Sequence, residues 1–296
     1  MGVPRATPRP AIPLHQPAAG IPHPAEEDCS ARQALITAAA RFAFSVTPRL
    51  DAELLMAHAL GIERSALLVD LDRAAPAGFA ALVARRERHE PIAYITGTRG
   101  FWTIDLHVAP GVLVPRADSE TLIEAAIDHF GDRSPRTILD LGTGSGALLL
   151  AALDHWPDAT GIGIDRSDAA LAIAAGNARR LGMQHRARFV RGDWTGFGGP
   201  HDLILCNPPY IATDERLPVE VAGFEPSGAL FAGADGLDDY RALAPVLRPQ
   251  LASGGAAILE IGATQGEAVT ALLEREGFVV GLRHDLGGRP RALVAT

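Results

Sequence analysis

The sequence contains no lysine, and all 27 of its basic residues are arginine. A Schiff-base lysine and the lysine of a Walker A phosphate loop are therefore excluded. Cysteine is almost as scarce, because the sequence has only Cys29 and Cys206, which lie far apart. Two distant thiols indicate neither a disulfide framework nor a metal site, so we expect no bound metal and a reducing compartment.

Positive charge and long apolar runs are also scarce. The formal net charge is −8, whereas proteins that grip nucleic acid usually present a basic surface that neutralises phosphates. The longest candidate apolar run, residues 147–153, is far shorter than the roughly 20 residues that span a bilayer. The N-terminus lacks the apolar core of a secretion signal. We therefore expect a cytoplasmic monomer that binds neither membranes nor, directly, nucleic acid.

Composition divides the 296 residues into four segments. Residues 1–28 are rich in proline and predict a disordered tail. Residues 29–97 have a helical pattern and predict a small helical bundle with a role in recognition. Residues 98–117 alternate like a β-hairpin, with Pro110-Gly111 as a turn, and predict a connector. Residues 118–296 predict a larger domain.

In the larger domain, short apolar segments alternate with helical ones. This alternation predicts an α/β, Rossmann-like domain with a mainly parallel sheet and helices on both faces. Ligands of such sheets bind at the carboxyl ends of the strands, and the motifs below lie at such ends. The expected strands cover 137–141, 161–165, 188–191, 202–206 and 256–261, with a closing pair, and the expected helices cover 147–155, 168–181, 237–251 and 265–276.

A glycine-rich loop follows the first expected strand. Its glycines allow a sharp turn and let the backbone approach a ligand closely. Asp165 ends the next expected strand, where a carboxylate can accept both ribose hydroxyls of a nucleoside. Helix capping by Asp140 and a turn role for Asp165 are the alternatives. The loop residues expected to bind a cofactor are Asp140, Gly142, Thr143, Gly144, Ser145 and Gly146.

The spacing of these glycines favours one cofactor over another. The pattern is G-x-G-x-G, which differs from the G-x-G-x-x-G that presents a helix terminus to pyrophosphate. S-adenosylmethionine has no phosphate, and Asp140 suits its cationic sulfonium and amino groups. We therefore favour S-adenosylmethionine over a nicotinamide cofactor.

Asp193 and Trp194 follow the third expected strand. The indole can cover the adenine face of the cofactor, and the segment can bond to the adenine edge. We therefore expect both residues in the cofactor site, with ordinary partial burial as the alternative for Trp194.

The most informative tetrapeptide, Asn207-Pro208-Pro209-Tyr210, directly follows the expected strand 202–206. An amide or aromatic amino nitrogen is a poor nucleophile, so its lone pair must be aimed at the sulfonium methyl. The Asn207 side-chain oxygen and the Pro208 carbonyl can each accept a hydrogen bond from the target NH2 group. Paired prolines stiffen the loop, and Tyr210 offers a flat wall for stacking. We predict catalytic roles for Asn207, Pro208 and Tyr210 and substrate binding by all four, with a stiff connector as the alternative.

Further segments carry a resemblance that extends from about Ser30 to the C-terminus. Together with the glycine loop and the tetrapeptide, they make the chain similar to the release factor glutamine methyltransferases, the PrmC/HemK family. The tetrapeptide alone also occurs in DNA adenine methyltransferases, whereas the segment 112–120 is far more discriminating. The further segments are residues 90–97, 101–102, 112–120, 224–226, 229–230 and 235–237.

This resemblance implies a class I S-adenosylmethionine-dependent methyltransferase domain and an N-terminal bundle, residues 29–97, that recognises the release factor. It implies methyl transfer to the side-chain amide nitrogen, N5, of the glutamine in the Gly-Gly-Gln motif of class I release factors. By match of motif, Gly142 to Gly146, Asp165, Trp194 and Asn207 would bind the cofactor, and residues 207–210 would hold the glutamine.

The chain departs from the family pattern at two positions. It has Ala117 and Ser119 where the family usually has proline and threonine. Serine keeps the hydroxyl, so its hydrogen bonding survives, and alanine loosens the loop slightly. Arg116 and Glu120 in the same segment either shape the substrate pocket or form a structural ion pair.

Two rival functions share parts of this pattern. A nucleic-acid adenine or cytosine amino methyltransferase would present basic grooves or a separate target-recognition domain, and the acidic charge counts against it. A binding module without catalysis would not need an intact glycine loop together with Asn207. Methylation of a glutamine in another protein stays open as an alternative.

Overall fold

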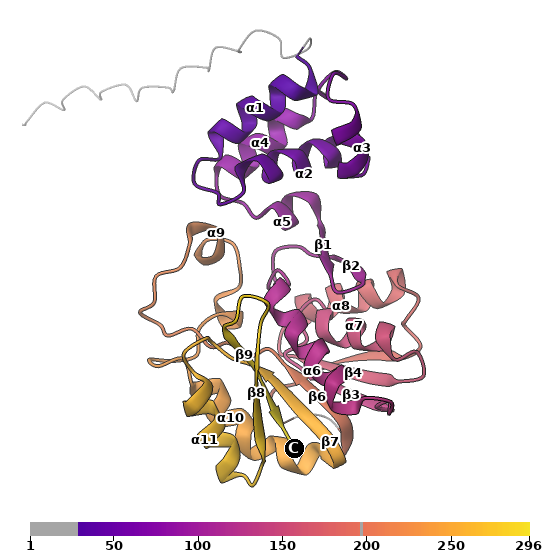
Figure 1. Ribbon diagram of the computed structural model, residues 1–296, viewed down its shortest axis with the longest axis vertical. Helices are drawn as coiled ribbons and strands as arrows, with labels where there is room; N and C mark the ends of the chain where they lie inside the picture. Colours follow the sequence, from indigo (N-terminus) through magenta and orange to yellow (C-terminus); the bar gives the residue numbers. More distant parts are fainter. Residues whose placement is uncertain (1–28, 196–197) are drawn as a thin grey trace, which may run out of the picture.

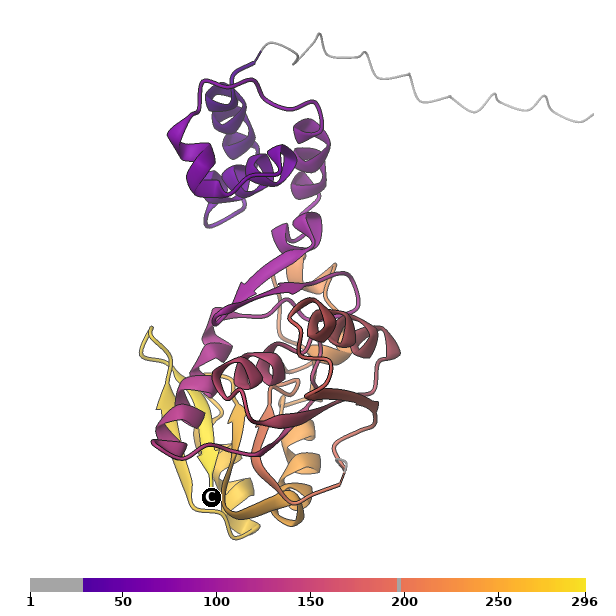
Figure 2. The ribbon, with the colours of Figure 1, turned by 90° about the vertical axis from the view of Figure 1, so that its right-hand side faces the viewer.

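The computed structural model describes residues 29–195 and 198–296, so the expected tail 1–28 lies outside the described residues. Figure 1 shows a helical bundle above a larger α/β part. Figure 2, at a right angle, shows that a short helix and a hairpin connect the two. Within the described ranges, no helix is both long enough and apolar enough to cross a membrane.

The bundle is built by helices that surround a core of their own. Leu35, Phe42 and Leu55 are fully buried in it. Local chemistry sets the helix ends, since the Ser30 side chain accepts a hydrogen bond from the backbone of the first turn and Pro48 occupies the first turn of the second helix. The helices are α1 (Ala31–Arg41), α2 (Pro48–Leu60), α3 (Arg64–Val69), α4 (Phe79–Glu87) and α5 (Ile92–Thr96).

The connecting hairpin is shorter than the sequence predicts. It consists of β1 (Thr98–Phe101) and β2 (Ile104–His107), so its turn lies at Trp102 and not at Pro110-Gly111. Trp102 takes a positive φ of 54°, a conformation that a sequence pattern does not signal in a non-glycine residue. The prediction of Pro110-Gly111 as the hairpin turn was therefore wrong, although these two residues do form a turn further along.

The described residues form a seven-stranded sheet in the order β5-β4-β3-β6-β7-β9-β8. The strands from β5 to β7 are parallel, and β9 and β8 join antiparallel. The chain runs outward from β3 to β5 and then returns to the other side of β3 with β6, which places a topological switch point at β3. The bounds are β3 (Thr137–Leu141), β4 (Thr160–Asp165), β5 (Ala187–Arg191), β6 (His201–Cys206), β7 (Leu251–Glu260), β8 (Val280–His284) and β9 (Pro290–Ala295).

Helices cover both faces of this sheet, as the alternation predicts. Successive residues of one strand face opposite sides, and in β6 Leu205 packs with one core while Ile204 and Cys206 pack with the other. The first core contains α6 (Glu120–Phe130), α7 (Ala147–His155) and α8 (Asp168–Arg180), and the second contains α10 (Asp238–Leu247) and α11 (Gly266–Arg275).

Shorter elements complete the rim around the carboxyl ends of the strands. The segment η1 (Ala117–Ser119) leads into α6, and α9 (Val219–Ala222) and η2 (Ser227–Ala229) follow the tetrapeptide of residues 207–210. In Figure 1, α9 lies on the side of the α/β part that faces the bundle. Arg86 of α4 donates a hydrogen bond of 2.7 Å to Glu220 of α9, so the two parts are in direct contact.

Candidate active site

The glycine loop turns the chain from β3 into α7. Gly142, Gly144 and Gly146 have φ values of 74°, 54° and 85°, which disfavour any side chain. The backbone N–H groups of Gly142 and Thr143 donate to the Ile164 carbonyl at 2.9 and 2.8 Å. These bonds tie the loop to the end of β4, so its shape is fixed before a ligand binds.

Asp165 at the end of β4 also holds the loop. Its Oδ2 accepts a hydrogen bond from Gly144 N at 2.9 Å, and its Oδ1 accepts one from Ser167 N at 2.9 Å. A carboxylate oxygen can accept more than one hydrogen bond. Asp165 therefore keeps acceptor capacity for a ligand's hydroxyl groups while it orders the loop.

Asp140 lies deeper than the sequence suggests. It is 1% exposed, and its Oδ2 accepts a hydrogen bond of 2.6 Å from the Thr143 hydroxyl. Its Oδ1 is buried and has no hydrogen-bond partner among the described residues. Burial raises the pKa of Asp140 to about 7, although the Thr143 hydroxyl opposes this shift. Such a buried acceptor without a partner is suited to a cationic or N–H group of a ligand.

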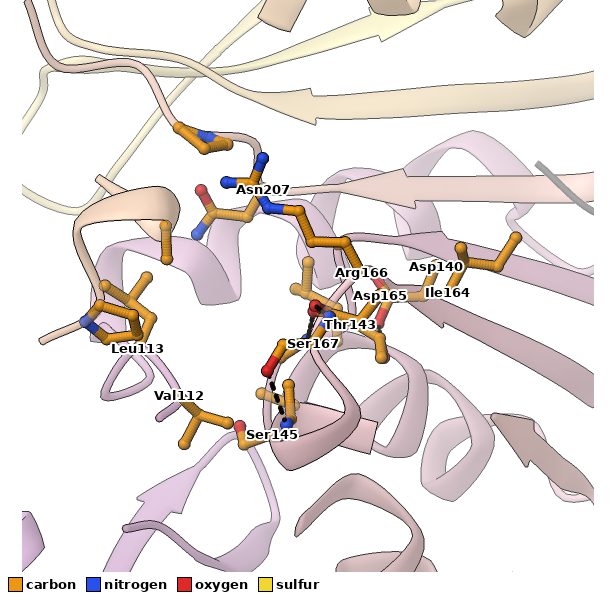
Figure 3. A pocket seen from close by; sticks show the side chains of 18 of the residues that line it. Val112, Leu113, Asp140, Thr143, Ser145, Ile164, Asp165, Arg166, Ser167 and Asn207 are labelled. Atoms are coloured by element: carbon orange, nitrogen blue, oxygen red, sulfur yellow. Dashed lines mark hydrogen bonds between the residues drawn. The ribbon is translucent and has the colours of Figure 1, made fainter. Parts of the chain in front are cut away.

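These groups line one cavity at the carboxyl ends of the strands (Figure 3). Its volume is about 240 Å³, near the lower end of small-molecule pockets, which span about 300 to 1,000 Å³. Of the residues expected to bind cofactor, Gly146 alone is not part of the lining. The expected residues that line the cavity are Asp140, Gly142, Thr143, Gly144, Ser145, Asp165, Asp193, Trp194 and Asn207.

Trp194 packs directly on the glycine loop. A Cβ atom added to Gly142 would lie 3.2 Å from the six-membered ring of the indole. The indole Nε1 donates a hydrogen bond of 2.7 Å to Asp239 Oδ1, which fixes the plane of the ring. Its neighbour Asp193 accepts hydrogen bonds from Thr195. Trp194 is thus an aromatic wall of the cavity and not only a core residue.

The tetrapeptide of residues 207–210 lies beside the glycine loop because β6 is the neighbour of β3. Leu141 and Cys206 are paired in the parallel register, so Gly142 and Asn207 leave the sheet side by side. Asn207 and Pro209 line the cavity, whereas Pro208 and Tyr210 do not. The Asn207 side-chain nitrogen donates a hydrogen bond of 3.2 Å to the Ser119 hydroxyl.

Tyr210 points toward a buried carboxyl. Its hydroxyl donates a hydrogen bond of 3.3 Å to Glu260 Oε1, and Glu260 is 1% exposed at the end of β7. Burial raises the pKa of the Tyr210 hydroxyl well above its usual range. In this geometry Tyr210 supports the loop of residues 207–210. The stacking of a substrate on the Tyr210 ring stays a prediction.

Arg116 and Glu120 prove to have separate partners. Arg116 lines the cavity and forms an ion pair of 2.6 Å with Glu225, which also accepts a hydrogen bond from Val114 N. Glu120 lies outside the cavity lining, and its Oε1 accepts a hydrogen bond of 2.9 Å from Trp102 N at the hairpin turn. Arg116 thus joins the segment before η1 to the loop that contains Glu225, whereas Glu120 stabilises the hairpin.

Three functional candidates escaped the sequence analysis. Arg166 lines the cavity (Figure 3) and donates a hydrogen bond to the Gly228 carbonyl of η2. Glu225, which the sequence pattern marked only as part of the segment 224–226, pairs with Arg116 and so anchors the loop that carries η2. Glu260 supports Tyr210, and its only local signal is a charged residue that ends a long apolar strand.

Two family models match parts of this chain. The family model described as the PrmC N-terminal domain matches residues 33–97, and a methyltransferase domain model matches residues 132–230. The solved structure of a methyltransferase from Pyrococcus furiosus has a similar fold, with a TM-score of 0.52 and 16% identity over 72% of this chain and 97% of that chain.

Two curated relatives are far more similar in sequence. The release factor glutamine methyltransferase of Rhodospirillum rubrum is 46% identical over 84% of this chain and 78% of its own length. The protein of the same name from Xylella fastidiosa is 45% identical over 83% of this chain and 92% of its own length. With this identity over most of both chains, the chain belongs to the release factor glutamine methyltransferase family.

Proposed function

We propose that this protein transfers a methyl group from S-adenosylmethionine to the N5 side-chain nitrogen of the glutamine in the Gly-Gly-Gln motif of class I release factors. The observation that carries the proposal is the placement of Asn207 beside the glycine loop on a shared cavity. The relatives named release factor glutamine methyltransferase support the choice of substrate.

The cavity residues fit the proposed cofactor. The buried Asp140 offers an unpartnered oxygen to its cationic groups, and Asp165 retains acceptor capacity for ribose hydroxyls. Trp194 offers an aromatic face for the adenine. When bound, S-adenosylmethionine supplies an activated methyl group on a positively charged sulfur.

The chain's own contribution is to orient the acceptor nitrogen. The Asn207 Oδ1 and the Pro208 carbonyl accept hydrogen bonds from the glutamine NH2 group and aim its lone pair into the cavity. The same acceptors stabilise the positive charge that develops on the nitrogen. No strong general base is needed, because the nitrogen carries a positive charge once it has been methylated and then loses one proton readily to water.

Recognition of the protein substrate falls to the bundle, residues 29–97, in this proposal. The match of residues 33–97 to the PrmC N-terminal domain supports it. The segment 98–117 then connects the bundle to a methyltransferase domain at 118–296. We further propose a cytoplasmic monomer that binds no nucleic acid directly, in line with the net charge of −8.

A transfer assay with labelled S-adenosylmethionine tests the function. The acceptors are a class I release factor, the same factor with Glu in place of the Gly-Gly-Gln glutamine, and duplex DNA that contains adenine. We expect label on the first acceptor alone, and Asn207→Ala should lower kcat by about 100-fold or more. Label on the DNA, or on the substituted factor at the wild-type rate, would contradict the proposal.

A further inference from the structure

Residues 225–229, the η2 wall, form one side of the cofactor cavity. A backbone hydrogen bond of 2.8 Å from Ala229 N to Pro226 O closes this stretch into a single short turn. Because this bond lies within the wall, the wall keeps its shape if it moves relative to the rest of the cavity. The wall residues that line the cavity are Pro226, Gly228 and Ala229.

One end of the η2 wall is buried and firmly held. The Glu225 side chain is 2% exposed and forms an ion pair of 2.6 Å with Arg116. Its carboxylate also accepts a hydrogen bond of 3.4 Å from Val114 N, and Phe224 packs against a buried cluster that includes Val114. Separation at this end would leave a buried carboxylate without its cationic partner, which is costly. The Glu225 end is therefore the fixed end.

The wall is held at a second point, which is open to solvent. Arg166 (Figure 3) donates a hydrogen bond to the Gly228 carbonyl. Both residues line the cavity, and both are exposed, so their contact lies at the mouth of the cavity. Water competes for a hydrogen bond in such a place and lowers its net contribution. The contact between the end of β4 and the η2 wall is therefore the one that opens more readily.

This contact requires glycine at position 228. A Cβ atom added to Gly228 would lie 2.5 Å from Arg166 Nη2, closer than Cβ atoms come in real proteins. Gly228 does not take a positive φ, so alanine suits its backbone. The guanidinium is the end of a long flexible side chain and can swing away at little cost to the fold. Gly228→Ala therefore breaks the contact from the opposite side and leaves the arginine in place.

We propose that the η2 wall is a gate of the cofactor cavity, hinged at Glu225 and latched by Arg166. The mouth that Arg166 and Gly228 border is then the route by which S-adenosylmethionine and its demethylated product exchange. A latch that contacts the wall and not the ligand slows entry and exit alike, and it leaves the affinity unchanged. A residue that binds the cofactor itself would instead act mainly on the dissociation rate. The inference concerns cofactor exchange and does not depend on the identity of the methyl acceptor.

Stopped-flow tryptophan fluorescence with S-adenosylhomocysteine, the demethylated product, tests the proposal, because the Trp194 indole is part of the cavity wall. Arg166→Ala and Gly228→Ala should each raise both the association and the dissociation rate constant about five-fold. The Kd should stay within about two-fold of the wild type. The double variant should match either single variant, because both substitutions remove the same contact.

Two matched substitutions serve as controls. A Cβ atom added to Gly281 would have nothing within 4 Å, and Arg191 forms an exposed ion pair outside the cavity lining. Gly281→Ala and Arg191→Ala should therefore keep the wild-type rate constants. Circular dichroism melting shows which variants are folded, and Gly228→Ala tests the latch by itself if Arg166→Ala proves unstable.

Three results would overturn the gate. A raised Kd with an unchanged association rate constant in Arg166→Ala would make Arg166 a direct contact of the cofactor. Additive effects in the double variant would show that Arg166 and Gly228 act separately. Wild-type rate constants in folded Gly228→Ala would show that the contact does not limit exchange. Since binding alone is measured, a failure of release factor methylation would leave this test intact.

Discussion

Replacement of Asp140 by asparagine should weaken S-adenosylmethionine binding in a pH-dependent way. Burial raises the pKa of Asp140 to about 7, and the cationic cofactor should bind the ionised form. About one molecule in ten would be ionised at pH 6 and about nine in ten at pH 8, so wild-type affinity should rise about ten-fold between these values. A hydrogen bond to a charged group contributes about 1.5–3 kcal/mol, so Asp140→Asn should bind about 10- to 100-fold more weakly at pH 8.

Isothermal titration calorimetry in two buffers of different ionisation enthalpy measures this effect. At pH 6 the wild type should release close to one proton for each cofactor bound, and Asp140→Asn should release almost none. Asp168→Asn is the matched control, because this carboxylate is exposed and lies outside the cavity lining. An affinity that does not change with pH, or wild-type affinity in Asp140→Asn, would show that the cofactor does not depend on the ionised Asp140.

Three further predictions concern stability and the glycine loop. The folded-state pKa of Glu260 is raised from 4.5 to about 7, so its contribution to stability is fully present below pH 4.5 and is lost as the pH rises through 7. In the wild type, the free energy of unfolding should therefore fall as the pH rises from 5 to 8.5. In Glu260→Gln this fall should be smaller by about 3 kcal/mol, as measured by urea unfolding. Arg86→Ala should destabilise the protein by about 3–5 kcal/mol in the same assay, because Asp51 would be left buried without its cationic partner. Gly142→Ala should weaken cofactor binding about ten-fold or more in calorimetry, because it strains a φ of 74° and pushes on Trp194.

Each of these predictions has a contrary result. An unchanged pH dependence in Glu260→Gln would show that this carboxyl is not the titrating group. A loss below 1 kcal/mol in Arg86→Ala would mean that the pair with Asp51 is well solvated. Wild-type affinity in Gly142→Ala would mean that the loop and Trp194 adjust without cost.

The strands of the larger domain could be predicted because they are buried on both faces. A run such as residues 203–206 is continuously apolar, and parallel strands between helices require that pattern. The glycine loop was predictable for a different reason, since the positive φ values at 142, 144 and 146 strongly favour glycine. Helix α6 was not placed by the sequence analysis, although its residues pack on the sheet.

The contacts that support the acceptor loop could not be predicted in this way. Ser119 and Asn207 are 88 residues apart in the sequence, and Tyr210 and Glu260 are 50 apart. Periodicity and spacing report local structure. Tyr210 meets Glu260 because β6 and β7 are neighbours in the sheet, and Ser119 meets Asn207 because both residues line the same cavity. The sequence therefore indicates which residues carry the chemistry, and the sheet order shows which residues hold them in place.

The most direct test of the central claim is tandem mass spectrometry of a class I release factor after incubation with this protein and S-adenosylmethionine. We expect one added methyl group on the side-chain nitrogen of the Gly-Gly-Gln glutamine, and its loss with Asn207→Ala. The preparation must bind the cofactor, and an active relative serves as positive control. An unmodified glutamine under these conditions would contradict the proposed methyl transfer.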